Sequence, residues 1–205
     1  MKTHLIILLL FLLISSLSFS CQKADNNEPV LWELQIDGTK TAIMETVDSI
    51  EYKFCLLNEA GNPVTTFSKG ENFSFLFSVT NKSGQKLLFD PEFAYSKDIT
   101  LCNVYKSTGE DLGKPFILLT SIDIGPGAYP FANGKSYIFQ SKWNNKLDSL
   151  WTWEQGNYKS VFTPILEKGN YYTEFKYQFH FPSAEQSGSM VKTDAINFKI
   201  NFIIQ

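Results

Sequence analysis

The chain has 205 residues, a formal net charge of -3 and a high aromatic fraction of 15%. All 18 basic residues are lysine, arginine is absent, and there are only two histidines. These counts exclude a metal site built from several histidines, bidentate arginine recognition of phosphate, and the basic surface that nucleic acid requires. The length corresponds to one domain, or to one domain with a tail.

The first 20 residues are predicted to be a secretory signal peptide. Lys2 supplies a basic start, residues 5–14 are uniformly apolar, and serines are frequent in residues 15–20. This order of basic, apolar and small residues is typical of export signals. The apolar run is too short for a transmembrane helix, which needs about 20 residues.

The next feature is the sequence Ser18-Phe19-Ser20-Cys21, which resembles the lipobox of bacterial lipoproteins in the relaxed form common in Bacteroidota. The resemblance implies that Cys21 becomes the N-terminus and carries a diacylglyceryl thioether and an N-acyl chain. More than one acyl chain gives stable membrane anchoring. Residues 21–29 are then a polar tether, and we expect the protein at the outer membrane, on its periplasmic or its cell-surface face.

Residues 30–205 are predicted to form one all-β domain. Apolar and polar residues alternate with a period of two in four long runs, at 50–57, 73–80, 171–181 and 196–204. Turn-forming sequences separate the runs. Seven or more short strands joined by turns favour an antiparallel β-sandwich or barrel, and residues 30–48 are expected to add an edge strand or a hairpin.

Four segments of this pattern resemble the intracellular proteinase inhibitor (BsuPI-type) family, over about residues 50–180. The segments are Phe73-x-Phe-x-Phe-x-Val-x-Asn81, Val104-Tyr105 with Gly109, Tyr137-x-Phe139-x-x-x-Trp143, and Leu166-x-x-Gly169-x-Tyr171. The resemblance implies an immunoglobulin-like sandwich. It also implies proteinase inhibition as an alternative function, which would need an exposed loop, and residues 122–131 are the candidate.

No catalytic residue, metal ligand set or cofactor is expected. His180 is the only histidine after the signal peptide, and the alternation places it on the polar face of its strand. No Gly-x-Ser-x-Gly sequence provides a nucleophile. The carboxylates at 90–92, 110–111 and 123 lack the order of a calcium-binding loop.

The cysteines Cys55 and Cys102 leave two alternatives open. Outside the cytoplasm they could form a disulfide, if their strands are adjacent. A disulfide would close a loop of roughly 48 residues and contribute about 4 kcal/mol in the chain-entropy model. Otherwise they are two separate thiols.

A cluster of tryptophans, Trp143, Trp151 and Trp153, also has two interpretations. Trp151 and Trp153 fall on one face of an extended segment, beside amide side chains, and an exposed group of this kind can stack on sugar rings. Tryptophans of sandwiches more often fill the core, where each buries roughly 150–250 Å². Both a ligand platform and core packing are therefore retained.

Two further segments, Asp48-Ser49-Ile50 and Asp148-Ser149-Leu150, resemble the sequence on which Bacteroidota O-glycosylate exported proteins. The resemblance implies sugar attachment at Ser49 and Ser149.

Together these features predict a lipid-anchored, extracytoplasmic binding or interaction module without catalytic activity. Its partners are expected to be the membrane, through Cys21, and a protein or glycan, but not nucleic acid. Proteinase inhibition of the BsuPI type and glycan binding at the cell surface are the alternative functions.

Overall fold

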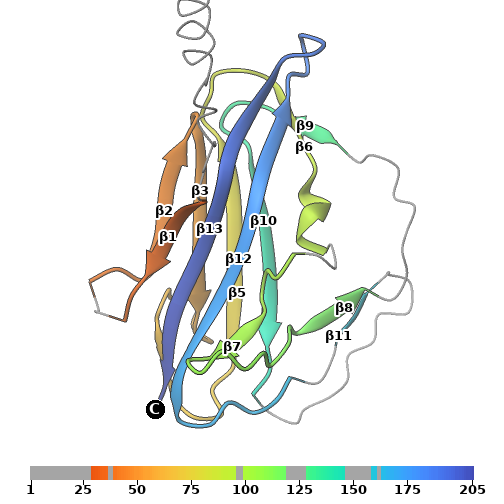
Figure 1. The fold of residues 1–205 in the computed structure, drawn as a ribbon. Helices are drawn as coiled ribbons and strands as arrows, with labels where there is room; N and C mark the ends of the chain where they lie inside the picture. The colour runs from red at the N-terminus through yellow and green to blue at the C-terminus, as the bar shows by residue number, and fades with distance from the viewer. Residues whose placement is uncertain (1–28, 37–38, 96–98, 119–127, 146–157, 161–162) are drawn as a thin grey trace, which may run out of the picture.

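The computed structural model describes residues 29–36, 39–95, 99–118, 128–145, 158–160 and 163–205. The structure is 56% strand, and its described part contains one short 3-10 helix, η1 (Pro91–Tyr95), and no α-helix. No helix in these ranges is long and apolar enough to cross a membrane. The expectation of an all-β fold is therefore confirmed (Figure 1).

Sheet A, the first of two facing sheets, is built around the long strand β13 (Figure 1). Its strands are β1 (Val30–Leu34), β4 (Thr66–Phe67), β7 (Val104–Lys106), β12 (Gly169–Pro182) and β13 (Met190–Ile204). β12 pairs antiparallel with β13 on one side and with β7 on the other. β1 and β4 pair parallel with β13, so the prediction of a purely antiparallel sandwich is wrong for these two pairs.

Sheet B, the second sheet, has the order β10-β5-β3-β2 and is antiparallel throughout. Its strands are β2 (Ala42–Val47), β3 (Ile50–Leu57), β5 (Phe73–Asn81) and β10 (Ser136–Trp143). Residues 30–48 therefore supply two edge strands, β1 in sheet A and β2 in sheet B. Two short ribbons complete the described strands: β6 (Leu87–Phe89) with β9 (Tyr129–Phe131), and β8 (Phe116–Leu118) with β11 (Tyr158–Ser160).

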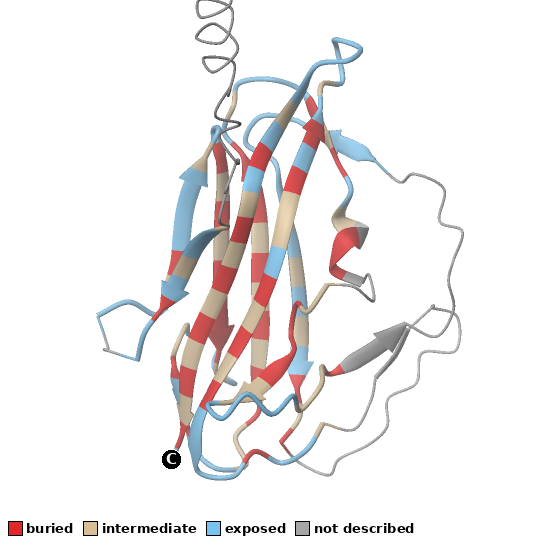
Figure 2. Cartoon of the chain, viewed as in Figure 1, coloured by how far each residue is buried: buried red, intermediate tan, exposed pale blue. Residues whose placement is uncertain are grey.

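Aromatic rings fill the space between the two sheets. The predicted alternation is confirmed in β12, in β13 and along most of β5, where buried residues alternate with more exposed ones (Figure 2). In β3 it is wrong for the second half of the strand, because Cys55 and Leu57, which the pattern places on the polar side, are buried as well. Phe175 and Phe198, a cross-strand pair of β12 and β13, stack with their ring centroids 4.7 Å apart. Phe54 of sheet B meets Phe175 edge to face at 5.4 Å, and Phe77 meets Phe198 in the same way at 5.4 Å. The rings of one sheet thus interlock with those of the other.

Asn81, the last residue of β5, joins three separate segments of the chain. Its buried Nδ2 donates to the carbonyl oxygens of Gln85 at 2.9 Å and Phe131 at 2.6 Å. Its Oδ1 accepts hydrogen bonds from the backbone N and the Oγ of Ser83, at 2.8 and 2.7 Å. The amide therefore holds the turn after β5 and the strand β9 against the end of sheet B.

We expect Asn81→Ala to lower the free energy of unfolding by about 2–4 kcal/mol, because it leaves a buried carbonyl without a donor and releases the turn. Urea denaturation measures the change. The control is Asn62→Ala, at an exposed turn position, which we expect to change stability by less than about 0.5 kcal/mol. An equal effect of both substitutions would contradict this role for Asn81.

Candidate functional site

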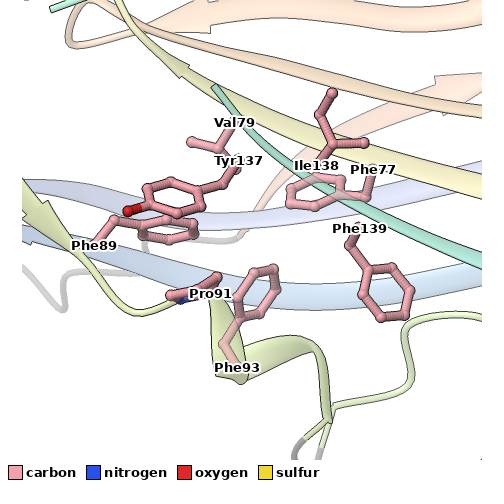
Figure 3. A pocket seen from close by; sticks show the side chains of 8 residues that line it. All are labelled: Phe77, Val79, Phe89, Pro91, Phe93, Tyr137, Ile138 and Phe139. Carbon is pink, nitrogen blue, oxygen red and sulfur yellow. The ribbon is translucent and has the colours of Figure 1, made fainter. Parts of the chain in front are cut away.

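An apolar pocket with a volume of about 240 Å³ lies beside the edge strand β10 (Figure 3). Three parts of the fold form its wall: the inner side of β5, the segment that runs from the end of β6 into η1, and the middle of β10. The lining residues are Phe77, Val79, Phe89, Pro91, Phe93, Tyr137, Ile138 and Phe139.

The helix η1 provides the wall of the pocket opposite β10. Pro91 begins this helix, and its fixed φ suits the first helical position, where the missing N–H costs no hydrogen bond. The turn directs Phe93 inward, where the ring stacks on Tyr177 at 4.8 Å and meets Phe77 edge to face at 5.7 Å. Phe93 is buried by these contacts, so η1 is held against the core by its aromatic side chain.

Tyr137 on β10 is fixed by polar contacts at the rim of the pocket. Its hydroxyl donates to the carbonyl oxygen of Pro130 at 3.1 Å. The Lys135 Nζ donates to the Tyr137 hydroxyl at 2.9 Å and lies 4.5 Å from the centroid of its ring. Phe89, the last residue of β6, packs on the ring of Tyr137 with the centroids 5.5 Å apart. The Tyr137 ring is therefore preorganised as one wall of the pocket.

The chemistry of the pocket is that of an apolar receptor. Its wall contains no lysine, histidine or carboxylate, and the hydroxyl of Tyr137 is already engaged. A cavity of 150 Å³ lined by apolar side chains is enough to bind benzene. A pocket of about 240 Å³ therefore has room for an aromatic or a branched aliphatic group. It offers no group for acid–base or nucleophilic chemistry.

The structure answers the question about Trp143 and leaves the other two tryptophans open. Trp143 ends β10 with 0% of its surface exposed, stacked 6.1 Å from Phe73. Its place in the predicted ligand platform is therefore wrong, since no ligand reaches a fully buried ring. Trp151 and Trp153 lie outside the described residues.

Cys55 and Cys102 are two separate, buried free thiols. Cys55 lies on β3 of sheet B, whereas Cys102 directly precedes Asn103 and β7 of sheet A. Cys55 thus lies in sheet B and Cys102 in the turn that leads into sheet A, not on adjacent strands, and both are free, so the alternative of a disulfide is not realised in the structure. Burial raises the pKa of the Cys55 thiol and raises that of Cys102 well above its ordinary value.

The remaining predicted residues are dispersed. Ser49 is exposed in the two-residue turn between β2 and β3, while Cys21 and Ser149 lie outside the described residues. His180 is exposed on the outer face of β12, as expected. Within the described ranges, no three His, Cys, Asp or Glu side chains are grouped to hold a metal ion.

The candidate inhibitory loop is described only at its end. Residues 122–127 lie outside the described structure, and Tyr129–Phe131 forms the strand β9, which pairs with β6. Phe131 is fully buried. The described end of the segment is thus a paired strand rather than a loop, with Tyr129 and Pro130 exposed and Phe131 in the core.

The apolar pocket was not predicted from the sequence. Its residues come from three segments that the fold brings together, and in the sequence each looks like an ordinary core residue. One local signal exists, the run Phe89-Asp90-Pro91-Glu92-Phe93, in which a proline turn follows a short apolar strand. The signal indicates a turn but gives no indication of a cavity.

No known protein family matches the sequence, and no curated protein is similar to it. The pocket is therefore interpreted from its own geometry.

We expect Cys55 and Cys102 to resist alkylation in the folded protein at pH 8, because burial and a raised pKa keep both thiols neutral. In denaturant without reductant both should react, as counted by mass spectrometry.

A raised pKa also means that the folded state holds the thiol proton more tightly. The free energy of unfolding should therefore fall as the pH rises above the pKa of an unfolded cysteine. Failure of either thiol to react in denaturant would contradict the free state.

Proposed function

We propose that this protein is a lipid-anchored module outside the cytoplasm that binds a partner through the pocket beside β10 and does not chemically change it. The observation that carries the proposal is the apolar wall between β10 and η1, with aromatic rings on several sides and about 240 Å³ of space. Elsewhere the same rings pack against one another. A pocket left in an otherwise filled aromatic core is a default candidate for a binding site.

The membrane location is supported by the signal-peptide pattern and by the lipobox resemblance at Cys21. Two facing sheets with an aromatic core are compatible with an immunoglobulin-like sandwich, which the resemblance to BsuPI-type inhibitors implies. Among the described residues, the pocket also provides no nucleophile and base in contact. These observations favour binding over catalysis.

A protein partner is favoured over a glycan by the chemistry of the pocket. Sugar rings need hydrogen-bond partners for their hydroxyls, and the side chains that line this pocket are nearly all hydrocarbon. An apolar side chain from a partner needs none. The proposed ligand group is accordingly an aromatic or branched aliphatic side chain.

The pocket can be tested with indole, a small mimic of such a side chain. We expect indole to give saturable shifts of the Val79 methyl and Phe139 ring signals in NMR spectra, since both residues line the wall. Val79→Met should abolish the shifts at Phe139, because a longer and flexible side chain occupies the space.

The matched control is Val47→Met, at the opposite edge of sheet B, where the same substitution leaves the pocket unchanged. We expect indole binding to be retained in this variant. Absence of saturable shifts in the wild-type protein, or equal binding by Val79→Met, would refute the pocket as the binding site.

Lipidation has its own test. Cells that express the full chain should incorporate radiolabelled palmitate into the protein, and Cys21→Ala should lose both the label and the membrane association. Cys102→Ala serves as the control, because that buried thiol is not a lipidation site. Equal membrane association of wild type and Cys21→Ala would contradict the anchor.

A further inference from the structure

β10 is an edge strand of sheet B whose middle is strongly exposed. It pairs with β5 on one side, and none of the strands in the described part of the chain pairs with its other side. Its side chains alternate, so that Tyr137 and Phe139 face the core while Ile138 and Gln140 face outward. Ile138 is 67% exposed, the largest value among the exposed large apolar residues of the described chain.

The direction of the backbone groups in β10 follows from the hydrogen bonds of β5. The Asn81 N donates to the Lys135 O at 3.0 Å, so the odd-numbered residues of β5 bond to β10. In an antiparallel pair, bonded and non-bonded residue pairs alternate along the ladder. Ile138 pairs with Ser78, an even-numbered residue, and is therefore non-bonded.

The outer backbone groups of β10 are consequently available for pairing. The N–H and C=O groups of Ile138 and Gln140 point away from β5, and no described residue bonds to them. Such an edge is a template for one more strand. Added strands obtain affinity from main-chain hydrogen bonds and specificity from pockets that accept alternate side chains.

The apolar pocket lies where an added strand would need it. Ile138 is one of the residues that line the pocket, although its side chain points away from Phe139 and Phe93, so the pocket lies against the backbone of β10 (Figure 3). Every second side chain of an added strand would face the core, on the same side of the sheet as Tyr137 and Phe139. These two residues face Phe93 across the pocket (Figure 3).

We propose that β10 receives an extended segment of a partner protein as an additional strand of sheet B, with one apolar side chain of that segment in the pocket. The inference rests on the proposed function and specifies its partner. The exposed Lys142, near the end of β10, favours an acidic residue at the corresponding end of the segment.

A second copy of this chain does not fit the same role. Pairing of two β10 strands would place Tyr137 and Phe139 of the copy along the seam, but these side chains face the core of their own domain. Tyr137 is also held by Lys135 and Pro130. A copy would therefore leave the pocket empty, whereas a separate extended segment can fill it.

The test is selection from a random-peptide phage library on the wild-type protein. We expect the selected peptides to share an apolar residue within an alternating, extended pattern. Ile138→Pro removes an outward N–H, which an edge strand tolerates. It should weaken binding of the selected peptides by about tenfold or more, since it also obstructs the neighbouring bonds.

The matched control is Met44→Pro on β2, the other edge of sheet B. Met44 is 60% exposed and pairs with Lys53, whose own backbone bonds are directed to β5, so its N–H also points outward. We expect this variant to bind the peptides like the wild type. Selection of no peptide, or equal binding by Ile138→Pro, overturns the proposal.

Two further measurements do not depend on the folding of a variant. In a peptide bound as a strand, every second amide N–H points toward β10. N-methylation of these amides should abolish binding, and N-methylation of the amides between them should preserve it. Hydrogen exchange at Ile138 and Gln140 should be fast in the free protein and slow with peptide bound. Protection of these amides in the free protein at every concentration would show that the chain itself covers the edge. That result overturns the proposal.

The indole experiment separates the two proposals. If the wild type binds indole but no peptide binds, the pocket is a binding site and strand addition is wrong. If the wild type does not bind indole, the pocket itself fails as the site.

Discussion

Burial of aromatic rings between two sheets is the constraint on which the rest of this structure depends. Phe175 and Phe198 stack within sheet A, and Phe54 and Phe77 of sheet B close on them edge to face. Full burial of such a side chain contributes about 1.5–3 kcal/mol, and favourable ring geometry adds about 0.5–1.5 kcal/mol for each pair. Each sheet has one apolar face, so neither is stable in water without the other.

The same constraint explains where the pocket lies. A sandwich of open sheets has edges, and its interior must be closed there by other parts of the chain. Beside β10 the closing element is η1, which contributes Phe93 and the ring of Pro91 but does not fill the space in front of Tyr137. At the other edge of sheet B, β2 lies close to β1, and the neighbouring hollow includes the charged residues Glu33, Lys40 and Glu45. The hollow at that edge is therefore partly charged, whereas the pocket beside β10 is lined by apolar side chains.

Much of the framework was predictable from local periodicity, because strand alternation reports directly which side chains are buried. Ile50, Tyr52 and Phe54 are buried as their spacing indicates, and so are Ile196 and Phe198. Periodicity carries no information on which strands become neighbours. Three features therefore could not be predicted: the parallel pairing of β1 with β13, the separation of Cys55 from Cys102, and the convergence of three segments on the pocket. Trp143 was ambiguous for a related reason, since a tryptophan suits both a core and a binding surface.

The position of β13 in sheet A has a consequence for biosynthesis. β13 is the last of the described strands to be made, yet β1, β4 and β12 all depend on it for their hydrogen bonds. Val30 has no partner residue in sheet A until Ile196 has been synthesised. Sheet A therefore cannot be completed until β13 is available. Until then the segments of β1 and β4 have no partner strand in this sheet, so their folding is coupled to formation of the β12–β13 pair.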